Sequence, residues 1–475
     1  MDLEILKYTS RFIVPFYFDN ENNGYKRICA QLDNSITYPQ SLGLPKDGEW
    51  IRSGFWENFR SDKTKQAEMD IYSYLLSILD DDKAVKSEKN IGASYIYKTD
   101  GKIFNLLYKH GDKSITFCCM DAGIVLFRNG IGFLWYETEF NNDKSLSIEE
   151  YVDFQHDFKE LARTHDDKFV RKYFDKEKNQ PAYETFCLGA WLSDFVFSPE
   201  LEIRFWAERY IEKEGKRIAV PDKALLFQYL FVDEGTVSER NNLAFQTANG
   251  YDAKYSSPED IDEKIYKPFG NASFYLSKSG MSCVVTNDDT NREFFKNQFS
   301  QKLIRDYFFV YVLLIFQSYS CANYSRMLTE LPADENLFNK KTMYINRLET
   351  LNGQINLFLV KSVYESVSNV HHQNGFYRYG KEVLCIEDDI QSLTIGLEAL
   401  RDIERDKRDR KVDIALVVFG FMVVVSAWID GLNLVDWFMS NSLGINSWHI
   451  GISIIIIVLT IYLIITLLKN RRGGR

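Results

Sequence analysis

The chain has 475 residues, a net charge of −10 and a sequence pI near 5.4. Its length predicts roughly two or three domains or layers, at about 150 residues each. The acidic balance argues against a nucleic-acid-binding protein, which needs a clustered basic face, so no direct nucleic-acid partner is expected.

The seven cysteines are odd in number, and no pair has the C-x-x-C spacing of redox and metal motifs. This usage predicts reduced, mostly buried thiols in a cytosolic setting. The N-terminus, Met1–Glu4, lacks a basic stretch followed by an apolar core, so no cleavable signal peptide is expected.

Short β-rich runs and helical patterns alternate in the N-terminal half. The dipeptide Asn129-Gly130 separates two strand-like runs, which is the strongest short hairpin signal. The expected strands are Phe12–Phe18, Ile115–Met120, Ile124–Arg128 and Ile131–Glu137, with a turn at Asp121–Gly123. The expected helices are Lys65–Leu79, Ile148–Ala162 and Leu201–Glu212. This mixture predicts an α/β or α+β domain and leaves both open.

One apolar run in the middle of the chain, Tyr307–Phe316, is followed by Gln317 and preceded by Arg305-Asp306. About ten apolar residues are too few to cross a bilayer, which takes about twenty. The run therefore predicts a helix buried in the core.

No proline follows Pro332, which permits long helices. Apolar residues then recur at spacings of three and four, as in a heptad seam. The seam comprises Val383, Ile386, Ile390, Leu393, Leu397 and Leu400. It fits either an amphipathic helix packed on its own domain or a neck that associates with other copies, and the segment that follows favours the neck. The pair His371-His372 is interpreted as an exposed helix end rather than a metal site.

Two apolar segments near the C-terminus predict membrane-spanning helices. The second, Trp448–Leu468, carries no charge, and the first, from Val412 to Leu434, is interrupted by Asp413 and Asp430. Lys and Arg lie outside the pair of segments, whereas the loop between them has none. The positive-inside rule then places both termini in the cytosol and the protein in the inner, cytoplasmic membrane, with the lipid bilayer as a partner.

The tripeptide Gly431-Leu432-Asn433 ends the first segment, and residues 380–472 resemble the CorA family of divalent-cation channels and transporters in layout. The family has Gly-Met-Asn here, usually preceded by an aromatic residue, so Leu432 and Asp430 depart from it. The resemblance implies a homo-oligomer, pentameric in the family, with a ring of Asn433 amides holding a hydrated Mg²⁺-like permeant ion. Asp430 is expected to add a charged ring.

A small or polar stripe and an apolar constriction are expected to line the pore along the first segment. These residues are Asp413, Gly420, Phe421, Val424 and Ala427. The expected domains are a cytosolic sensor (1–332), a helical neck (333–411), transmembrane helices (412–434 and 448–468), an outside loop (435–447) and a basic tail (469–475).

The large cytosolic part resembles a CorA-like subgroup encoded with type III CRISPR systems. That likeness implies an antiviral effector opened by a nucleotide messenger such as an S-adenosylmethionine–AMP conjugate. No motif identifies the nucleotide site, and neither a catalytic constellation nor a metal cluster is visible, so no enzymatic activity and no bound cofactor are expected. A housekeeping Mg²⁺/Co²⁺ transporter and a membrane-anchored nucleotide-processing enzyme are the alternatives.

Overall fold

The computed structural model describes residues 4–19, 23–33, 48–52, 70–72, 75, 91–99, 102–141, 146–162, 168–175, 180–185, 187, 189, 203–213, 215–287, 291–330, 341–399, 416–417 and 419–420. The chain divides into two compact units, Met1–Gly396 and Leu397–Arg475. All the named helices and strands belong to the first unit.

The strands are β1 (Ile5–Phe18), β2 (Glu49–Arg52), β3 (Gly92–Lys98), β4 (Phe104–His110), β5 (Lys113–Phe127), β6 (Ile131–Phe140), β7 (Phe169–Asp175), β8 (Gln180–Thr185), β9 (Ile203–Phe205), β10 (Glu208–Lys213), β11 (Lys216–Pro221), β12 (Leu225–Val232), β13 (Ala272–Ser277) and β14 (Gly280–Thr286). The α-helices are α1 (Gly24–Asp33), α3 (Ile148–Lys159), α5 (Val237–Asn249), α6 (Ser300–Lys302), α7 (Phe308–Thr329), α8 (Lys341–Ser362) and α9 (His371–Val383). A 3₁₀ turn, η5 (Ile261–Lys264), and two π-helical segments, η6 (Phe294–Phe299) and η7 (Leu303–Tyr307), complete the set.

A 12-stranded sheet organises the unit, with the main order β13-β14-β12-β1-β6-β5-β4-β7-β8. The central strand β1 pairs antiparallel with both β12 and β6, whereas β12 and β14 pair in parallel. A parallel pair needs a crossover, and α5 supplies part of it. The helix α5 begins at a capping box formed by Thr236 and Glu239, and it ends at Gly250, whose φ of 59° is the left-handed conformation that glycine adopts without strain.

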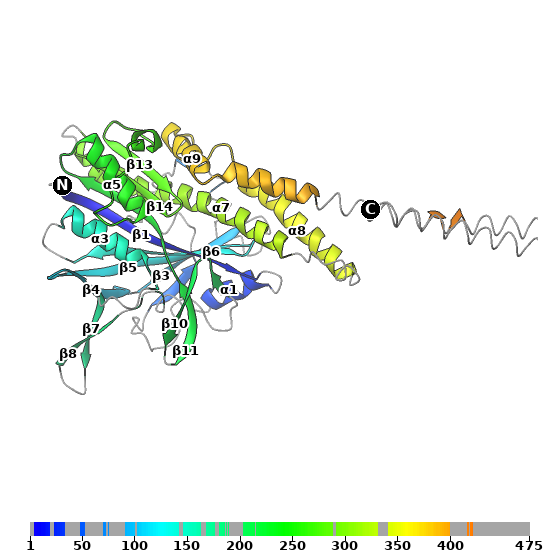
Figure 1. Ribbon diagram of the computed structural model, residues 1–475, viewed down its shortest axis with the longest axis horizontal. Helices are drawn as coiled ribbons and strands as arrows, with labels where there is room; N and C mark the ends of the chain where they lie inside the picture. Colours follow the sequence, from blue (N-terminus) through cyan, green and yellow to red (C-terminus); the bar gives the residue numbers. More distant parts are fainter. Residues whose placement is uncertain are drawn as a thin grey trace, which may run out of the picture. The chain divides into compact units, whose positions relative to one another are not determined.

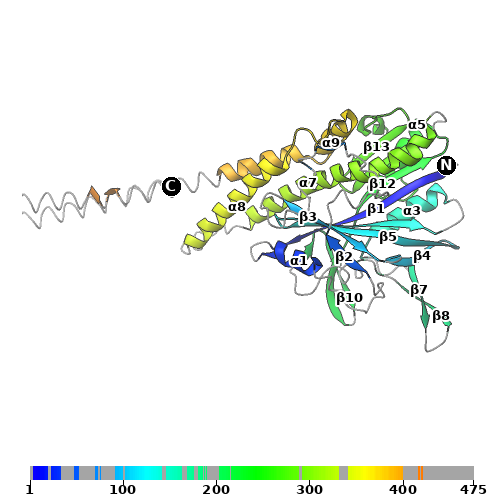
Figure 2. The ribbon, with the colours of Figure 1, turned by 180° about the vertical axis from the view of Figure 1, so that it is seen from behind.

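Helices cover both faces of this sheet (Figures 1 and 2). Successive side chains of a strand point to opposite faces, and β1 shows this alternation directly. The Phe12 ring meets Phe158 of α3 with centroids 4.9 Å apart, while the guanidinium of Arg11 lies 4.5 Å from the Phe308 ring of α7. The helices α3 and α7 therefore lie on opposite faces of the sheet.

Several predicted elements are confirmed. The strand Phe12–Phe18 lies within β1, and the Asn129-Gly130 hairpin joins β5 to β6. The helix predicted from Ile148 is α3, which starts at a capping box between Ser147 and Glu150. The apolar run Tyr307–Phe316 is buried, and most of it forms the first half of α7. The mixed sheet-and-helix character of the N-terminal part is also present.

Two local predictions are wrong. The turn expected at Asp121–Gly123 lies inside β5, where a β-bulge shifts the register between Cys119 and Asp121. Gly123 permits packing there and not a turn, since a Cβ atom would come within 2.5 Å of the Trp135 ring. The helix expected at Leu201–Glu212 is instead β9 and β10, because these residues pair with β1 and with β11. Most of the helix expected at Lys65–Leu79 lies outside the described residues.

The π-helical segments η6 and η7 are tied to the sheet by side chains of β1. Lys7 Nζ donates to the Lys296 carbonyl oxygen at 2.8 Å, and Arg11 Nη1 donates to the Ile304 carbonyl oxygen at 2.7 Å. Widened helical turns disturb the regular ladder of backbone hydrogen bonds. Charged donors from the sheet bond to carbonyls of these turns, so we infer that they stabilise the entry to α7.

The carboxyl group of Asp306 in η7 is fully buried, and Arg305 Nε donates to it at 2.6 Å while Gln373 Nε2 donates at 3.3 Å. Burial raises the pKa of Asp306, and Arg305 opposes the shift. A raised pKa means that the folded state holds this proton more tightly than the unfolded state. The stability that the proton contributes is therefore lost as the pH rises from the unfolded pKa of about 3.9 through the folded pKa.

We accordingly expect the stability of Asp306→Asn relative to the parent to rise with pH across that window, because the variant does not titrate there. Denaturant unfolding at a series of pH values measures the difference. Asp260→Asn is the control with the opposite dependence on pH. Its stability relative to the parent should fall as the pH rises, since Lys264 lowers the pKa of that exposed carboxyl. A variant less stable than the parent by about 2 kcal/mol at neutral pH would show that the ionised pair with Arg305 dominates.

Within the described residues, no helix is both long enough and apolar enough to cross a membrane. This finding contradicts the two transmembrane helices of the predicted fold class. It also contradicts the transmembrane and ion-channel assignments and the inner-membrane location. The helix α7 has 22 residues, but polar residues such as Gln317 and Asn323 occupy its second half. The segments 412–434 and 448–468 lie outside the described residues, apart from 416–417 and 419–420.

The predicted heptad seam is interrupted. The helix α9 ends at Val383, and Cys385 adopts a left-handed φ of 54° before a second helical stretch, 386–399. Ile386, Leu393 and Leu397 are buried in a single copy of the chain. Val383 and Ile390 are partly exposed, and Leu400 lies outside the described residues. Packing on the same chain therefore accounts for Ile386 and Leu393 without a second copy.

Candidate ligand-binding site

A pocket of about 110 Å³, open on one side, lies between the β5–β6 turn, α7 and α8. Arg128 and Asn129 of the turn line one side, and Ser362 at the end of α8 lines another. An engineered cavity of about 150 Å³ holds benzene, so this smaller volume encloses only part of a planar ring, and the rest of a ligand would lie outside it.

Three aromatic side chains form the apolar wall of the pocket: Phe316 and Tyr324 of α7 and Phe358 of α8. The Phe358 ring lies 5.9 Å from Phe316 and 5.5 Å from Tyr324 between centroids, and Phe127 stacks behind Phe316 at 3.7 Å. Buried aromatic clusters of this kind hold their rings in fixed orientations. The wall therefore offers a pre-formed surface to a flat ligand.

Polar and charged groups complete the lining, with cations from Arg128 and Lys361 and amides from Asn129 and Gln354. The Arg128 guanidinium lies 5.3 Å from the Tyr25 ring, and Asn129 Nδ2 donates to Ser320 Oγ at 2.8 Å. These contacts hold the turn residues in place beside α7. Aromatic rings beside cations are the combination that binds a base together with a phosphate.

The phenol of Tyr324 stays uncharged in this setting. Burial raises its pKa, and a hydrogen bond with Asn129 opposes the shift only in part. A neutral phenol adds no negative charge to the pocket, so the two cations face no ionised group from this residue.

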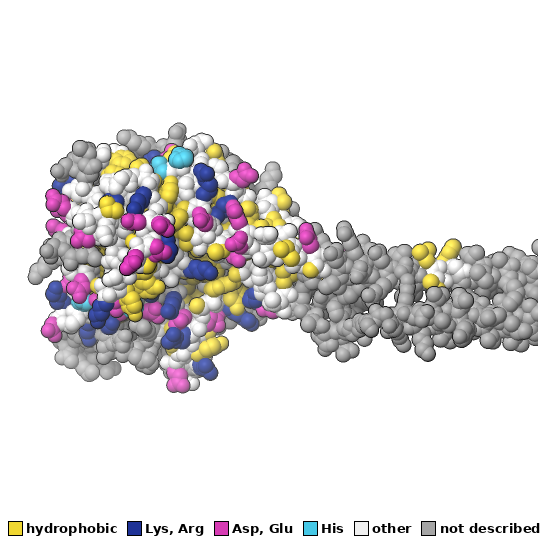
Figure 3. Space-filling model, turned by 45° about the horizontal axis from the view of Figure 1, so that its top comes forward, with side chains coloured by type: hydrophobic (Ala, Val, Ile, Leu, Met, Phe, Trp, Pro, Cys, Tyr) yellow, Lys and Arg dark blue, Asp and Glu magenta, His cyan; other side chains and the backbone are white. Residues whose placement is uncertain are grey.

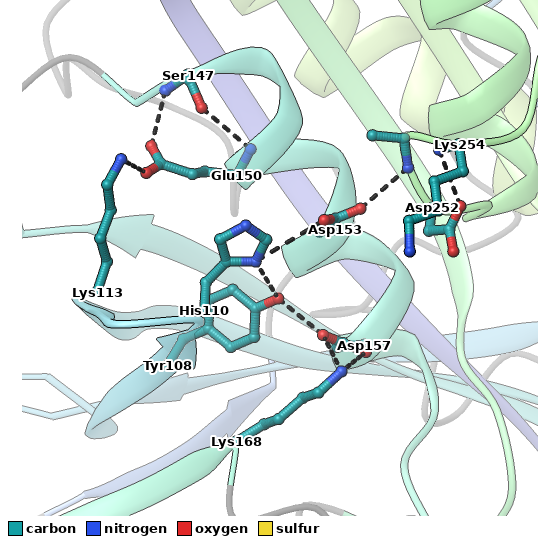
Figure 4. Close-up of polar contacts among 11 residues, drawn as sticks. Tyr108, His110, Lys113, Ser147, Glu150, Asp153, Asp157, Lys168, Asp252 and Lys254 are labelled. Carbon is teal, nitrogen blue, oxygen red and sulfur yellow. Dashed lines mark hydrogen bonds and ion pairs between the residues drawn. The ribbon is translucent and has the colours of Figure 1, made fainter.

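A second polar cluster joins α3 to β4 and to Lys168, just before β7 (Figure 4). The Tyr108 hydroxyl donates to Asp157 Oδ2 at 2.7 Å, and Lys168 Nζ donates to both carboxylate oxygens of Asp157 at 2.8 Å. His110 Nδ1 lies 3.8 Å from Asp153 Oδ2 and 3.5 Å from the Tyr108 hydroxyl oxygen. A histidine beside a carboxylate can act as a general base.

The surrounding contacts favour a structural role for this cluster. Burial and the nearby Asp157 raise the pKa of Tyr108, so its hydroxyl acts as a hydrogen-bond donor and not as a nucleophile. The Ala253 amide donates to Asp153 at 3.0 Å, and Lys159 Nζ donates to the Asn249 carbonyl oxygen at 2.8 Å. The cluster thus fastens α3 to β4 and to the loop after α5.

The structure places few of the residues expected to act at a pore. Gly420 is described, while Asp413, Phe421, Val424, Ala427, Asp430, Gly431, Leu432 and Asn433 lie outside the described residues. His371 is exposed at the first residue of α9, and His372 Nδ1 lies 2.6 Å from the Tyr307 hydroxyl oxygen. In the described chain, no group of three or more His, Cys, Asp or Glu residues is arranged to hold a metal ion. The homo-oligomer stays a prediction.

Sequence reasoning missed the pocket because its lining residues come from four separated parts of the chain, near positions 91, 128, 320 and 360. The signals that pointed towards it were the Asn129-Gly130 hairpin and the buried run that ends at Phe316.

Figure 3 shows Lys and Arg interspersed with Asp and Glu over the face that it presents. No family model, no curated protein and no solved structure matches the chain.

Proposed function

We propose that the Met1–Gly396 unit is a sensor that binds a nucleotide in the pocket between the β5–β6 turn, α7 and α8. The observation that carries the proposal is the aromatic wall of Phe316, Tyr324 and Phe358 beside the cations of Arg128 and Lys361. In this arrangement a base enters against the rings, and the phosphate stays at the open side near the cations.

The choice of ligand class also follows the expected likeness of the large N-terminal part to a subgroup opened by a nucleotide messenger. The S-adenosylmethionine–AMP conjugate is therefore the first probe, with ATP and AMP for comparison. A sensor of this kind acts by binding and turns nothing over, in agreement with the structural role inferred for the His110 cluster.

The test is calorimetric titration of the full chain with each nucleotide. We expect saturable binding of the conjugate at one site per chain. Lys361→Gln and Arg128→Gln should each raise its dissociation constant about tenfold, because a hydrogen bond to a charged group contributes about 1.5–3 kcal/mol. Lys264→Gln is the matched control, since this exposed lysine pairs with Asp260 in η5, among residues that do not line the pocket.

No heat of binding at millimolar nucleotide, or equal binding by the parent and both pocket variants, would overturn the proposal. Hydrolysis of the nucleotide that Asp153→Asn abolishes would favour the enzyme alternative at the His110 cluster.

A further inference from the structure

Gln317 lies directly behind the pocket and bonds to two helices at once. It is fully buried and follows the pocket residue Phe316 in α7. Its Nε2 donates to the carbonyl oxygen of Ser362, which lines the pocket at the end of α8, at 2.5 Å. The same Nε2 donates to the Tyr377 hydroxyl of α9 at 2.8 Å, and that hydroxyl also lies 3.2 Å from Gln317 Oε1. One carboxamide thus joins α7, α8 and α9.

The contacts continue beyond α9. Lys381 Nζ lies 5.6 Å from the centroid of the Tyr377 ring and 2.6 Å from the Glu387 carboxylate. Glu387 belongs to the helical stretch that starts after the left-handed Cys385. The chain of contacts therefore runs from the pocket wall through Gln317, Tyr377 and Lys381 to the segment 386–396.

The helix α9 packs closely against α7. A Cβ atom at Gly380 would lie 2.3 Å from the Leu314 side chain, so the two helices approach closely at this glycine. A buried carboxamide whose partners are all in place is costly to displace, because each lost bond leaves a buried polar group unsatisfied. A shift of Ser362 or Phe316 would therefore disturb the bonds that Gln317 makes to α9.

We propose that Gln317 couples occupancy of the pocket to α9 and to the segment 386–396. The inference rests on the proposed function, since it needs a nucleotide in the pocket. A ligand shifts a conformational equilibrium only when it binds one conformation more tightly than the other. The Gln317 bonds make the affinity of the pocket depend on the conformation of α9, because the same carboxamide contacts a pocket residue and α9.

The experiment is hydrogen exchange of the full chain with and without the S-adenosylmethionine–AMP conjugate, read on peptides covering α9 and 386–396. In the parent we expect the conjugate to change exchange rates there by at least about fivefold, the lower end of typical coupling between sites. Gln317→Met and Tyr377→Phe should keep the dissociation constant within about threefold while losing most of that change in exchange.

Tyr379→Phe is the matched control in the same helix. Its hydroxyl donates to the Lys264 carbonyl oxygen at 2.7 Å and accepts from the Leu276 amide, away from the pocket residues. This variant should respond to the conjugate as the parent does. If Gln317→Met fails to fold, Tyr377→Phe decides alone, because it removes a single hydroxyl.

The outcomes separate the two proposals. A parent that binds no nucleotide overturns the proposed function and this inference with it. A parent that binds without any change in α9 overturns the coupling alone. A full exchange response in Gln317→Met and Tyr377→Phe, or a loss of binding of more than about tenfold in either, also overturns it, the latter because Gln317 would then belong to the binding site.

Discussion

Arg11→Met should lower the free energy of unfolding by about 3 kcal/mol, the lower end of the range for removing one partner of a buried ion pair, because the remaining Glu137 side chain is 23% exposed. Arg11 is 3% exposed, and its Nε donates to Glu137 Oε2 at 2.7 Å. The substitution leaves Glu137 without this cation and the Ile304 carbonyl of η7 without its donor. Denaturant unfolding followed by circular dichroism measures the loss.

Two further variants show whether the buried pair is the cause. Arg11→Met combined with Glu137→Leu should recover most of the loss, because replacing both partners removes the isolated charge. Arg209→Met is the matched surface control. Its ion pair with Asp222, at 2.8 Å, has an arginine side chain that is 57% exposed, so the cost should stay below about 1 kcal/mol. A loss in Arg11→Met as small as in Arg209→Met would contradict the role assigned to the buried pair.

Phe117→Ala should lower the free energy of unfolding by about 3–5 kcal/mol, the range for removing a buried phenylalanine side chain. Phe117 of β5 is fully buried, and its ring lies 4.8 Å from Phe154 and 5.1 Å from Phe158, both on α3. Truncation opens a cavity between β5 and α3, and the neighbouring rings cannot fill it without leaving their packed orientations.

Unfolding curves of three variants test this expectation. Phe117→Leu should cost less than Phe117→Ala, since it refills part of the volume. Tyr255→Ala, at a side chain that is 57% exposed, should cost below about 1 kcal/mol. Equal losses in Phe117→Ala and Phe117→Leu would indicate that the site collapses around the truncation instead of leaving a cavity.

Arg11→Met and Phe117→Ala are expected to differ in their effect on the candidate pocket. Arg11 holds the entry to α7, the helix that carries Phe316 and Tyr324. Phe117 supports the opposite face of the sheet. We therefore expect Arg11→Met to weaken nucleotide binding as well as stability, and Phe117→Ala to act on stability alone while the protein remains folded.

Local patterns were sufficient wherever one interaction between near neighbours decides the structure. The Asn129-Gly130 turn, the helix from Ile148 and the buried run from Tyr307 to Phe316 could all be predicted from the sequence. In each, the deciding contact lies within a few residues or follows from apolarity alone. The sequence also determined that the chain carries a mixed sheet-and-helix domain.

Tertiary contacts decided the rest. Gly123 was expected in a turn, but the Trp135 ring requires a residue without a side chain at that point of β5. The segment from Ile203 forms strands because it pairs with β1 and β11, and its own sequence pattern does not reveal these partners. The Gln317 contacts join residues 45 and 60 positions apart, and the pocket joins residues still farther apart in the sequence. Only packing of α7, α8 and α9 on the sheet brings them together. Local periodicity carries no information about such distances. The sequence alone therefore determined the elements that local contacts fix, while the folded chain determined the two wrongly predicted segments and the site.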